Sequence, residues 1–333
     1  MRRLLALAAL LAWPLAALAA PAGGAPYSQR PEVKAFAREL AVQHGFVEKE
    51  LLFLFSRVRP VQPVLKAIAT PPDQTRSWQQ YRALFMSEKR IAGGAAFWAA
   101  NRAALARAEE QFGVPPQYVV AVIGVETLYG RHKGTYRVVD ALATLAFDYP
   151  PRADFFREQL VDFLIMARDE DLDVFSLRGS YAGAFGIPQF MPGSARRYAV
   201  DFDSSGRIDL SRSAADAVGS VANFLERHGW QRGGPVAFPA QVQGEAWRRY
   251  ATGEVTPVAT VAELAAAGAT PREGSAPADA RAALIELATP GEPSQFLLGL
   301  QNFYAITRYN RSAFYAAAVD ELARAIAGRM AGR

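Results

Sequence analysis

Apolar residues recur at helical spacing over most of the chain, which predicts a mainly α-helical protein. From about Pro31 to Ala108 they form stripes such as Val33, Phe36, Ala37 and Leu40, as on one face of an amphipathic helix. Helices are also expected over residues 97–112, 118–125, 153–170, 216–228 and 296–330. Because residues 118–125 are nearly all apolar, we expect that helix to be buried on most sides.

The pattern changes twice in the second half of the chain. Residues 179–192 are rich in glycine and aromatic residues and are expected to be irregular. Between 233 and 293 proline and glycine increase, and short Val/Leu runs appear at 255–261 and 283–287. These runs predict a small subdomain that contains strands.

Composition narrows the class of protein. The 333 residues are 51% hydrophobic and 21% charged, and none is cysteine. This is a globular composition that excludes disulfides, thiol nucleophiles and cysteine-bound zinc. The three histidines lie far apart, which argues against a histidine metal site. The net charge of +5 is not concentrated in a basic run, so no nucleic-acid partner is expected.

The first residues have the pattern of a secretory signal peptide. Arg2 and Arg3 precede an apolar run, and Ala17-Leu18-Ala19 is a small-x-small cleavage site, so we expect residues 1–19 to be removed on export. The alternative is an uncleaved membrane anchor. No later stretch reaches the roughly 20 apolar residues that span a bilayer, so no stable anchor is expected after cleavage.

One carboxylate is isolated in an apolar setting. Glu126 is the sole acidic residue between Glu110 and Asp140, and it ends the predicted helix at 118–125. Burial disfavours the charged form of a carboxyl and raises its pKa, which suits a general acid. The alternative is a helix-end glutamate that turns to solvent or pairs with Arg131.

The irregular segment at 179–192 offers groups that suit a sugar. Gly183 and Gly186 allow close backbone approach, and Ser180 and Gln189 offer hydrogen bonds. Aromatic faces for stacking are offered by Tyr181, Phe185 and Phe190. An ordinary packed loop with buried aromatic residues would have the same composition.

Residues 201–209 contain half of a metal-binding motif. Asp201, Asp203 and Ser205 stand at positions 1, 3 and 5, and Gly206 stands at position 6, as in the front half of an EF-hand calcium loop. Arg212 occupies position 12, where a glutamate normally closes the loop, and Asp216 is the next acid. A solvated Asx-turn is the alternative.

Taken together, these segments resemble the B-type lytic transglycosylases of bacterial peptidoglycan (glycoside hydrolase family 103). The matching blocks occur in order through most of the chain. They are Trp78-x-x-Tyr81-Arg82, Phe112–Pro116, Gly124–Thr127, Asp140–Leu145, Met166–Glu170, Gly179–Pro192, Val218–Phe224 with His228–Trp230, and Asn302–Asn310.

The resemblance implies a fold with a lysozyme-like catalytic core, a helical domain from both chain ends and a small β-containing subdomain. The expected parts are a helical domain at 26–113, the core at 114–232 with the EF-hand-like loop at 201–216, the β-subdomain at 233–293, and a helical segment at 294–333 that packs back on the cleft. It also implies a periplasmic location, with peptidoglycan glycan strands as the partner and other cell-wall enzymes as further partners.

The resemblance also implies roles for individual residues. Glu126 is the catalytic acid. The substrate cleft is formed by Tyr81, Arg152, Ser180, Gln189, Tyr309, Asn310 and Tyr315. No cofactor is required, and a structural calcium would be held by Asp201, Asp203, Ser205, the Arg207 carbonyl and Asp216.

Several positions depart from the family's pattern. A single Arg152 stands where the family often has two arginines, and Phe185 stands where methionine is common. Ser205 replaces an aspartate and Ser211 a tryptophan, which weakens the calcium motif because affinity follows ligand charge.

The activity implied is non-hydrolytic cleavage of the MurNAc-β-1,4-GlcNAc bond, which leaves 1,6-anhydroMurNAc ends. The alternatives are a non-catalytic glycan-binding protein of the cell wall and a muramidase that hydrolyses the same bond.

Overall fold

A computed structural model describes residues 25–69, 76–274 and 276–332. The predicted signal peptide, residues 1–19, lies outside the described residues. The chain forms two compact units, residues 1–57 and 58–333. Within the described ranges no helix is long and apolar enough to cross a membrane.

The described part of the first unit is a pair of helices, α1 (Pro31–His44) and α2 (Glu48–Arg57), after a 3₁₀ turn at Tyr27–Gln29. Helix α1 starts with a proline, whose fixed φ suits a first helical position, and it ends at Gly45 in the left-handed conformation. The rings of Phe36 and Phe55 meet edge-on with centroids 6.0 Å apart. The predicted apolar stripes therefore form the core of this unit.

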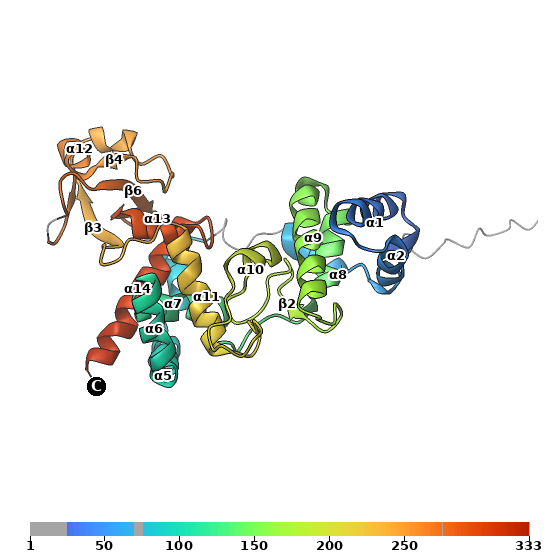
Figure 1. The fold of residues 1–333 in the computed structure, drawn as a ribbon. Helices are drawn as coiled ribbons and strands as arrows, with labels where there is room; N and C mark the ends of the chain where they lie inside the picture. Colours follow the sequence, from blue (N-terminus) through green and yellow to red (C-terminus); the bar gives the residue numbers. More distant parts are fainter. Residues whose placement is uncertain (1–24, 70–75, 275, 333) are drawn as a thin grey trace, which may run out of the picture. The chain divides into compact units, whose positions relative to one another are not determined.

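The second unit is mainly helical, as predicted (Figure 1). Before its sheet it contains α3 (Gln62–Ala69), α4 (Trp78–Phe85), α5 (Glu88–Ala100), α6 (Arg102–Phe112), α7 (Pro116–Thr127), α8 (Val138–Asp148), a 3₁₀ turn (Pro150–Arg152), α9 (Ala153–Asp169), α10 (Pro192–Tyr198) and α11 (Ala214–Arg227). Strands β1 (Tyr136–Arg137) and β2 (Arg178–Gly179) form a two-stranded antiparallel pair.

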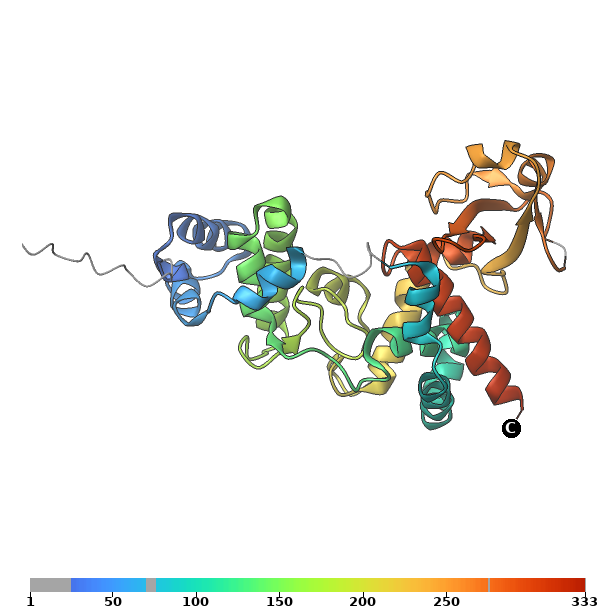
Figure 2. The same ribbon diagram turned by 180° about the vertical axis from the view of Figure 1, so that it is seen from behind.

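Helix α7 lies at the centre of this unit. Its residues 119–124 are all buried, as the apolar run predicted. The last helix, α14 (Ala313–Ala331), packs against α7, α5 and α4, and Figure 2 shows α4 in cyan beside the red α14. The final helix of the chain therefore contacts the helix that carries Glu126.

The remaining part of the second unit contains a five-stranded antiparallel sheet in the order β4-β6-β7-β3-β5. Its elements are β3 (Ala237–Val242), a 3₁₀ turn (Ala246–Arg249), β4 (Ala259–Thr260), α12 (Val261–Ala266), β5 (Ala269–Pro271), β6 (Arg281–Leu287) and β7 (Gln295–Gly299). Leu264, Leu284 and Leu298 are buried in its core, where the Trp247 ring meets Phe296 edge-on at 5.0 Å.

One predicted boundary was wrong. The segment expected to be helical from 296 begins with β7, which lies between β6 and β3 in the sheet, and only then come α13 (Gln301–Thr307) and α14. A short apolar run such as Phe296–Leu300 fits a strand and a helix equally well by periodicity alone. The boundary between the two units lies between Arg57 and Val58, inside the helical domain expected at 26–113.

Candidate active site

Glu126 lies in the last turn of α7, where a side chain from the end of the chain meets it. The Tyr315 hydroxyl on α14 donates a hydrogen bond of 2.7 Å to Glu126 Oε1. Glu126 as a whole residue is partly exposed. Among the described residues the Glu126 carboxyl is bonded to Tyr315 and not to Arg131, which was the alternative partner.

The surroundings of Glu126 favour its neutral form. Burial raises the pKa of the Glu126 carboxyl to about 7, and the hydrogen bond from Tyr315 partly opposes this rise. The raised pKa predicted from the apolar helix is confirmed. Near neutral pH the group is therefore present both as an acid and as a carboxylate, and it can donate or accept a proton.

A second tyrosine extends this site. The ring of Tyr309 lies nearly parallel to that of Tyr315, with centroids 6.4 Å apart, and its hydroxyl donates to the Pro188 carbonyl at 2.6 Å. Burial, and then the charge of Glu126, raise the pKa of both tyrosines well above the usual range. Both hydroxyls therefore remain neutral donors.

Tyr81 completes the cluster of aromatic residues beside Glu126. It is buried, and its ring packs on Phe85 and on Phe314 of α14, at 5.2 and 5.8 Å. Tyr81 is close enough to Tyr315 to raise the pKa of that phenol further. The structure thus brings Glu126, Tyr81, Tyr309 and Tyr315 together, although they are far apart in the sequence.

The irregular segment at 179–192 is attached to the end of α7. The Thr127 hydroxyl donates to the Ile187 carbonyl at 2.8 Å and accepts from the Gly130 amide at 2.9 Å. Gly183 has a φ of 84°, and a Cβ there would lie 2.4 Å from Leu142, so the packing of the loop itself favours glycine at this position.

Two of the predicted stacking faces in this segment were wrong. Phe185 and Phe190 are 4% and 2% exposed, and Phe190 packs on Phe224 in the core. An apolar ring gains more from burial in the core than from the solvent-facing wall of a cleft. Tyr181 remains partly exposed.

Ser180 and Gln189 support the loop itself. The Ser180 hydroxyl oxygen accepts from the amides of Ala182 and Ala184. Gln189 Nε2 donates to the carbonyls of Lys133 and Gly186, at 3.1 and 3.0 Å. The nitrogen of Gln189 is thereby bound to the protein, and Pro188, which accepts from Tyr309, is its neighbour in sequence.

Arg152 and Asn310 are not brought into contact with the tyrosines and Glu126. Arg152 is exposed, and its guanidinium lies over the ring of Phe155 at 4.5 Å. Asn310 is exposed, and its backbone carbonyl accepts from the Ser312 amide. Both side chains remain accessible from solvent.

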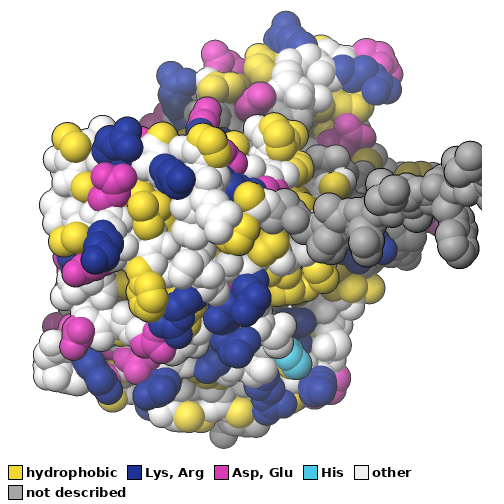
Figure 3. Space-filling view, turned by 90° about the vertical axis from the view of Figure 1, so that its right-hand side faces the viewer, with side chains coloured by type: hydrophobic (Ala, Val, Ile, Leu, Met, Phe, Trp, Pro, Cys, Tyr) yellow, Lys and Arg dark blue, Asp and Glu magenta, His cyan; other side chains and the backbone are white. Residues whose placement is uncertain are grey.

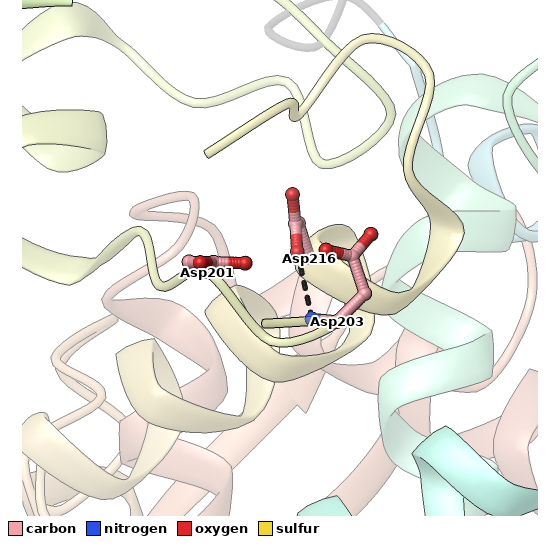
Figure 4. Close-up of side chains that lie close together, drawn as sticks. All are labelled: Asp201, Asp203 and Asp216. Atoms are coloured by element: carbon pink, nitrogen blue, oxygen red, sulfur yellow. Dashed lines mark hydrogen bonds between the residues drawn. The ribbon is translucent and has the colours of Figure 1, made fainter. Parts of the chain in front are cut away.

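The acidic loop gathers three carboxylates (Figure 4). Oxygen atoms of Asp201, Asp203 and Asp216 lie within 4.8 Å of one another. Asp216, at the start of α11, is fully buried and accepts from the amides of Phe202 and Asp209. Gly206 has a φ of 88°, which its position in the loop requires.

The donor set of this loop fits a hard cation. Ser205 Oγ lies 3.1 Å from the Arg207 carbonyl oxygen, so hydroxyl and carbonyl oxygens stand beside the three carboxylates. Hydrogen bonds from Ser213 and Ser205 lower the pKa of Asp203, which keeps that carboxylate charged. Calcium prefers such all-oxygen sites.

Thr127 and Pro188 are residues of the site that the sequence patterns did not single out. Thr127 joins Glu126's helix to the irregular segment, and the Pro188 carbonyl orients Tyr309. A polar residue directly after the isolated glutamate was the available signal for Thr127. No sequence signal marks a backbone carbonyl such as that of Pro188.

A mainly helical core with a carboxyl of raised pKa at the end of a buried helix is typical of lysozyme-like, glycan-cleaving enzymes. Residues 28–324 match the family described as the transglycosylase SLT domain. The chain belongs to this family.

Known relatives agree with this membership over nearly the whole chain. Membrane-bound lytic murein transglycosylase B of Escherichia coli (strain K12) is 40% identical over 313 residues, which cover 91% of this chain and 85% of that protein. The crystal structure of soluble lytic transglycosylase SltB1 from Pseudomonas aeruginosa has a TM-score of 0.84 and 45% identity, covering 91% of this chain and all of that one. The Escherichia coli lytic transglycosylase Slt35, solved in complex with calcium, has a TM-score of 0.82 and 40% identity, covering 93% and 96%.

Proposed function

We propose that this protein is a lytic transglycosylase of peptidoglycan in which Glu126 alone performs the acid–base chemistry. The observation that carries the proposal is the Glu126 carboxyl, with a pKa raised to about 7 and a hydrogen bond from Tyr315. Most glycoside hydrolases need two carboxylates. A group that is half ionised near neutral pH can serve first as acid and then as base.

In the proposed reaction, neutral Glu126 protonates the oxygen that links N-acetylmuramic acid to N-acetylglucosamine. The substrate's own N-acetyl group stabilises the positive charge that develops at C1 as this bond breaks. The Glu126 carboxylate then accepts the proton of the muramic C6 hydroxyl, whose oxygen attacks C1 and closes a 1,6-anhydro ring. Glu126 returns to its neutral form, and no water is consumed.

The tyrosines orient the acid in this scheme. The hydrogen bond from Tyr315 to Oε1 leaves Oε2 to face the glycosidic oxygen. Tyr309 stays neutral and hydrogen-bonded to the protein, so neither phenol competes for the transferred proton. Tyr309 is partly exposed and would contact the sugar rings nearest the cleaved bond. Tyr81 and Tyr315 are buried and would act on the substrate through Glu126.

The other predicted cleft residues would act further along the glycan strand. Arg152 and Asn310 are exposed, and their polar groups can hydrogen-bond a long polymer away from Glu126. Ser180 and Gln189 would act mainly by holding the 179–192 segment in shape, since their side chains bind its backbone.

We further propose that the loop at 201–216 holds a structural calcium through Asp201, Asp203, Ser205, the Arg207 carbonyl and Asp216. Support comes from the clustered carboxylates and from the calcium complex of Slt35. A bound calcium would offset the repulsion among the three acids and fix the start of α11.

The setting proposed for this activity is the periplasm, reached after removal of residues 1–19. Figure 3 shows a face on which Lys and Arg lie among Asp, Glu and hydrophobic side chains. The modest positive net charge favours approach to an acidic polymer without holding it tightly. Other cell-wall enzymes are further partners that this setting allows.

The test is digestion of purified peptidoglycan by the mature protein, with mass spectrometry of the soluble products. Products lighter by one water, with 1,6-anhydro ends, are expected from the wild type and from Glu110→Gln, which alters an exposed carboxylate on α6. Glu126→Gln should release none. Reducing ends would instead indicate a muramidase, and no release by the wild type would indicate a glycan-binding protein.

A further inference from the structure

The turn that follows Glu126 is left-handed at three consecutive residues. Leu128, Tyr129 and Gly130 have φ angles of 50°, 62° and 83°. For leucine and tyrosine this conformation is unfavourable, because Cβ crowds the following carbonyl. Contacts from elsewhere must therefore hold the turn in place.

The Tyr129 ring fills the space between α5 and α7. A Cβ added to Gly93 or Gly94 of α5 would lie 2.9 or 2.7 Å from Tyr129 atoms, and one added to Gly124 of α7 would lie 2.6 Å from its hydroxyl oxygen. The ring also packs on Phe97, with centroids 5.7 Å apart. Three glycines thus make room for this one side chain.

Arg90 on α5 bonds both the Tyr129 hydroxyl and the C-terminal end of α7. Its backbone carbonyl accepts from the Tyr129 hydroxyl at 2.8 Å, while its guanidinium donates to the carbonyls of Gly124 and Leu84. The guanidinium therefore stands at the C-terminal end of α7, where a positive charge is favourable. Its Nε is buried without a hydrogen-bond partner among the described residues, so placing the side chain there costs free energy of folding.

We propose that Tyr129 and Arg90 are positioning residues that clamp the last turn of α7 to α5 and so hold the Glu126 carboxyl against Tyr315. The inference rests on the proposed function, in which Glu126 transfers the proton. Neither residue needs to touch the substrate. If the clamp is released, Leu128 and Tyr129 can return to ordinary φ angles and the last turn of α7 can rotate. A displacement of 1 Å at a reacting group can cost about 100-fold in rate.

Gly124→Ala tests the clamp selectively. The three atoms nearest to the added Cβ all belong to Tyr129, so the substitution displaces that ring first, while alanine itself favours a helix. On soluble glycan strands we expect kcat to fall about 10- to 100-fold with KM within about two-fold. Because the displaced carboxyl loses the Tyr315 hydrogen bond that lowers its pKa, the pH profile of kcat should also move to higher pH.

Two further variants separate positioning from simple loss of folding. Adding Tyr129→Phe to Gly124→Ala removes the hydroxyl oxygen nearest to the new Cβ and should restore part of kcat. Arg90→Lys keeps the charge but loses the planar fork whose two nitrogens donate to Gly124 and Leu84. It should lower kcat in the same way, and it replaces Gly124→Ala as the test if that variant fails to fold. Tyr118→Phe is the matched control. It also removes a tyrosine hydroxyl from α7, but this hydroxyl bonds Asp320, so kcat and its pH profile should stay unchanged.

The proposal is overturned if folded Gly124→Ala and Arg90→Lys keep the wild-type kcat and pH profile, or if activity falls only in proportion to the folded fraction. Glu126→Gln, assayed alongside, distinguishes failure of the proposed function from failure of the positioning role of Tyr129 and Arg90. Turnover by Glu126→Gln would remove the proposed function, and this inference with it. An inactive Glu126→Gln beside fully active clamp variants would remove this inference alone.

Discussion

Glu126→Gln should make the folded protein more stable at neutral pH while it abolishes activity. The pKa of this carboxyl is about 7 in the fold and near 4.5 in a solvated chain. At 1.36 kcal/mol per pH unit, ionising the folded carboxyl costs about 1–3 kcal/mol, the lower value allowing for its remaining contact with solvent. Glutamine avoids this cost and keeps an oxygen to accept from Tyr315.

The raised pKa of Glu126 also determines whether stability rises or falls with pH. A carboxyl with a raised pKa binds its proton more tightly in the folded protein, so stability falls as pH rises from 4.5 to 7 and is constant above that range. The stability difference between Glu126→Gln and wild type should therefore be about 1–3 kcal/mol larger at pH 8 than at pH 4.5.

Denaturant unfolding followed by tryptophan fluorescence measures this difference. All tryptophans beyond residue 24, namely Trp78, Trp98, Trp230 and Trp247, lie in the second unit, so the signal reports the unit that contains Glu126. Glu110→Gln provides the control for loss of a surface charge. An equal difference at both pH values, or a Glu126→Gln variant that is less stable at pH 8, would refute the reasoning.

Three other outcomes are expected. Tyr315→Phe removes the hydrogen bond that lowers the pKa of Glu126, so the pH profile of kcat should move to higher pH; an unmoved profile would contradict this. Millimolar calcium should raise the melting temperature of the wild type but not of Asp201→Asn, as binding to the folded state alone requires; equal shifts would place the ion elsewhere. Tyr118→Phe leaves the buried Asp320 with one fewer donor, which should cost about 1–3 kcal/mol in denaturant unfolding, and an unchanged midpoint would show that the bond contributes nothing.

The parts of the fold that depend on local periodicity could be predicted from the sequence. Helix α7 was expected because its apolar run has no polar face, and Glu126 was singled out because an isolated carboxyl in such a run must change its pKa or find a partner. Both arguments need only neighbours along the chain. The strand β7 could not be distinguished from a helix, because its hydrogen-bond partners lie in β3 and β6.

The partner of Glu126 is a non-local feature. Tyr315 is 189 residues away, and its spacing fits the apolar stripe of the last helix as well as it fits a cleft. The resemblance placed it at the substrate, and the stripe placed it in the core. The structure confirms the core position, because Tyr315 is 2% exposed, and it brings the hydroxyl to the Glu126 carboxyl. Contact of Tyr315 with the substrate stays a prediction.

The unfavourable features of the molecule concentrate around this carboxyl. Among the described residues, five that are not glycine have positive φ, and Leu128, Tyr129 and Gln189 of these belong to the turn after Glu126 or to the segment attached to it. Arg90, whose buried Nε has no hydrogen-bond partner among the described residues, donates from α5 to Gly124 in the last turns of α7. Strain persists only where the surrounding structure holds it, and here glycines on two helices make room for the ring that does so. A fold selected for stability alone would relax this turn, so the strain is best explained by the need to hold Glu126 in one orientation.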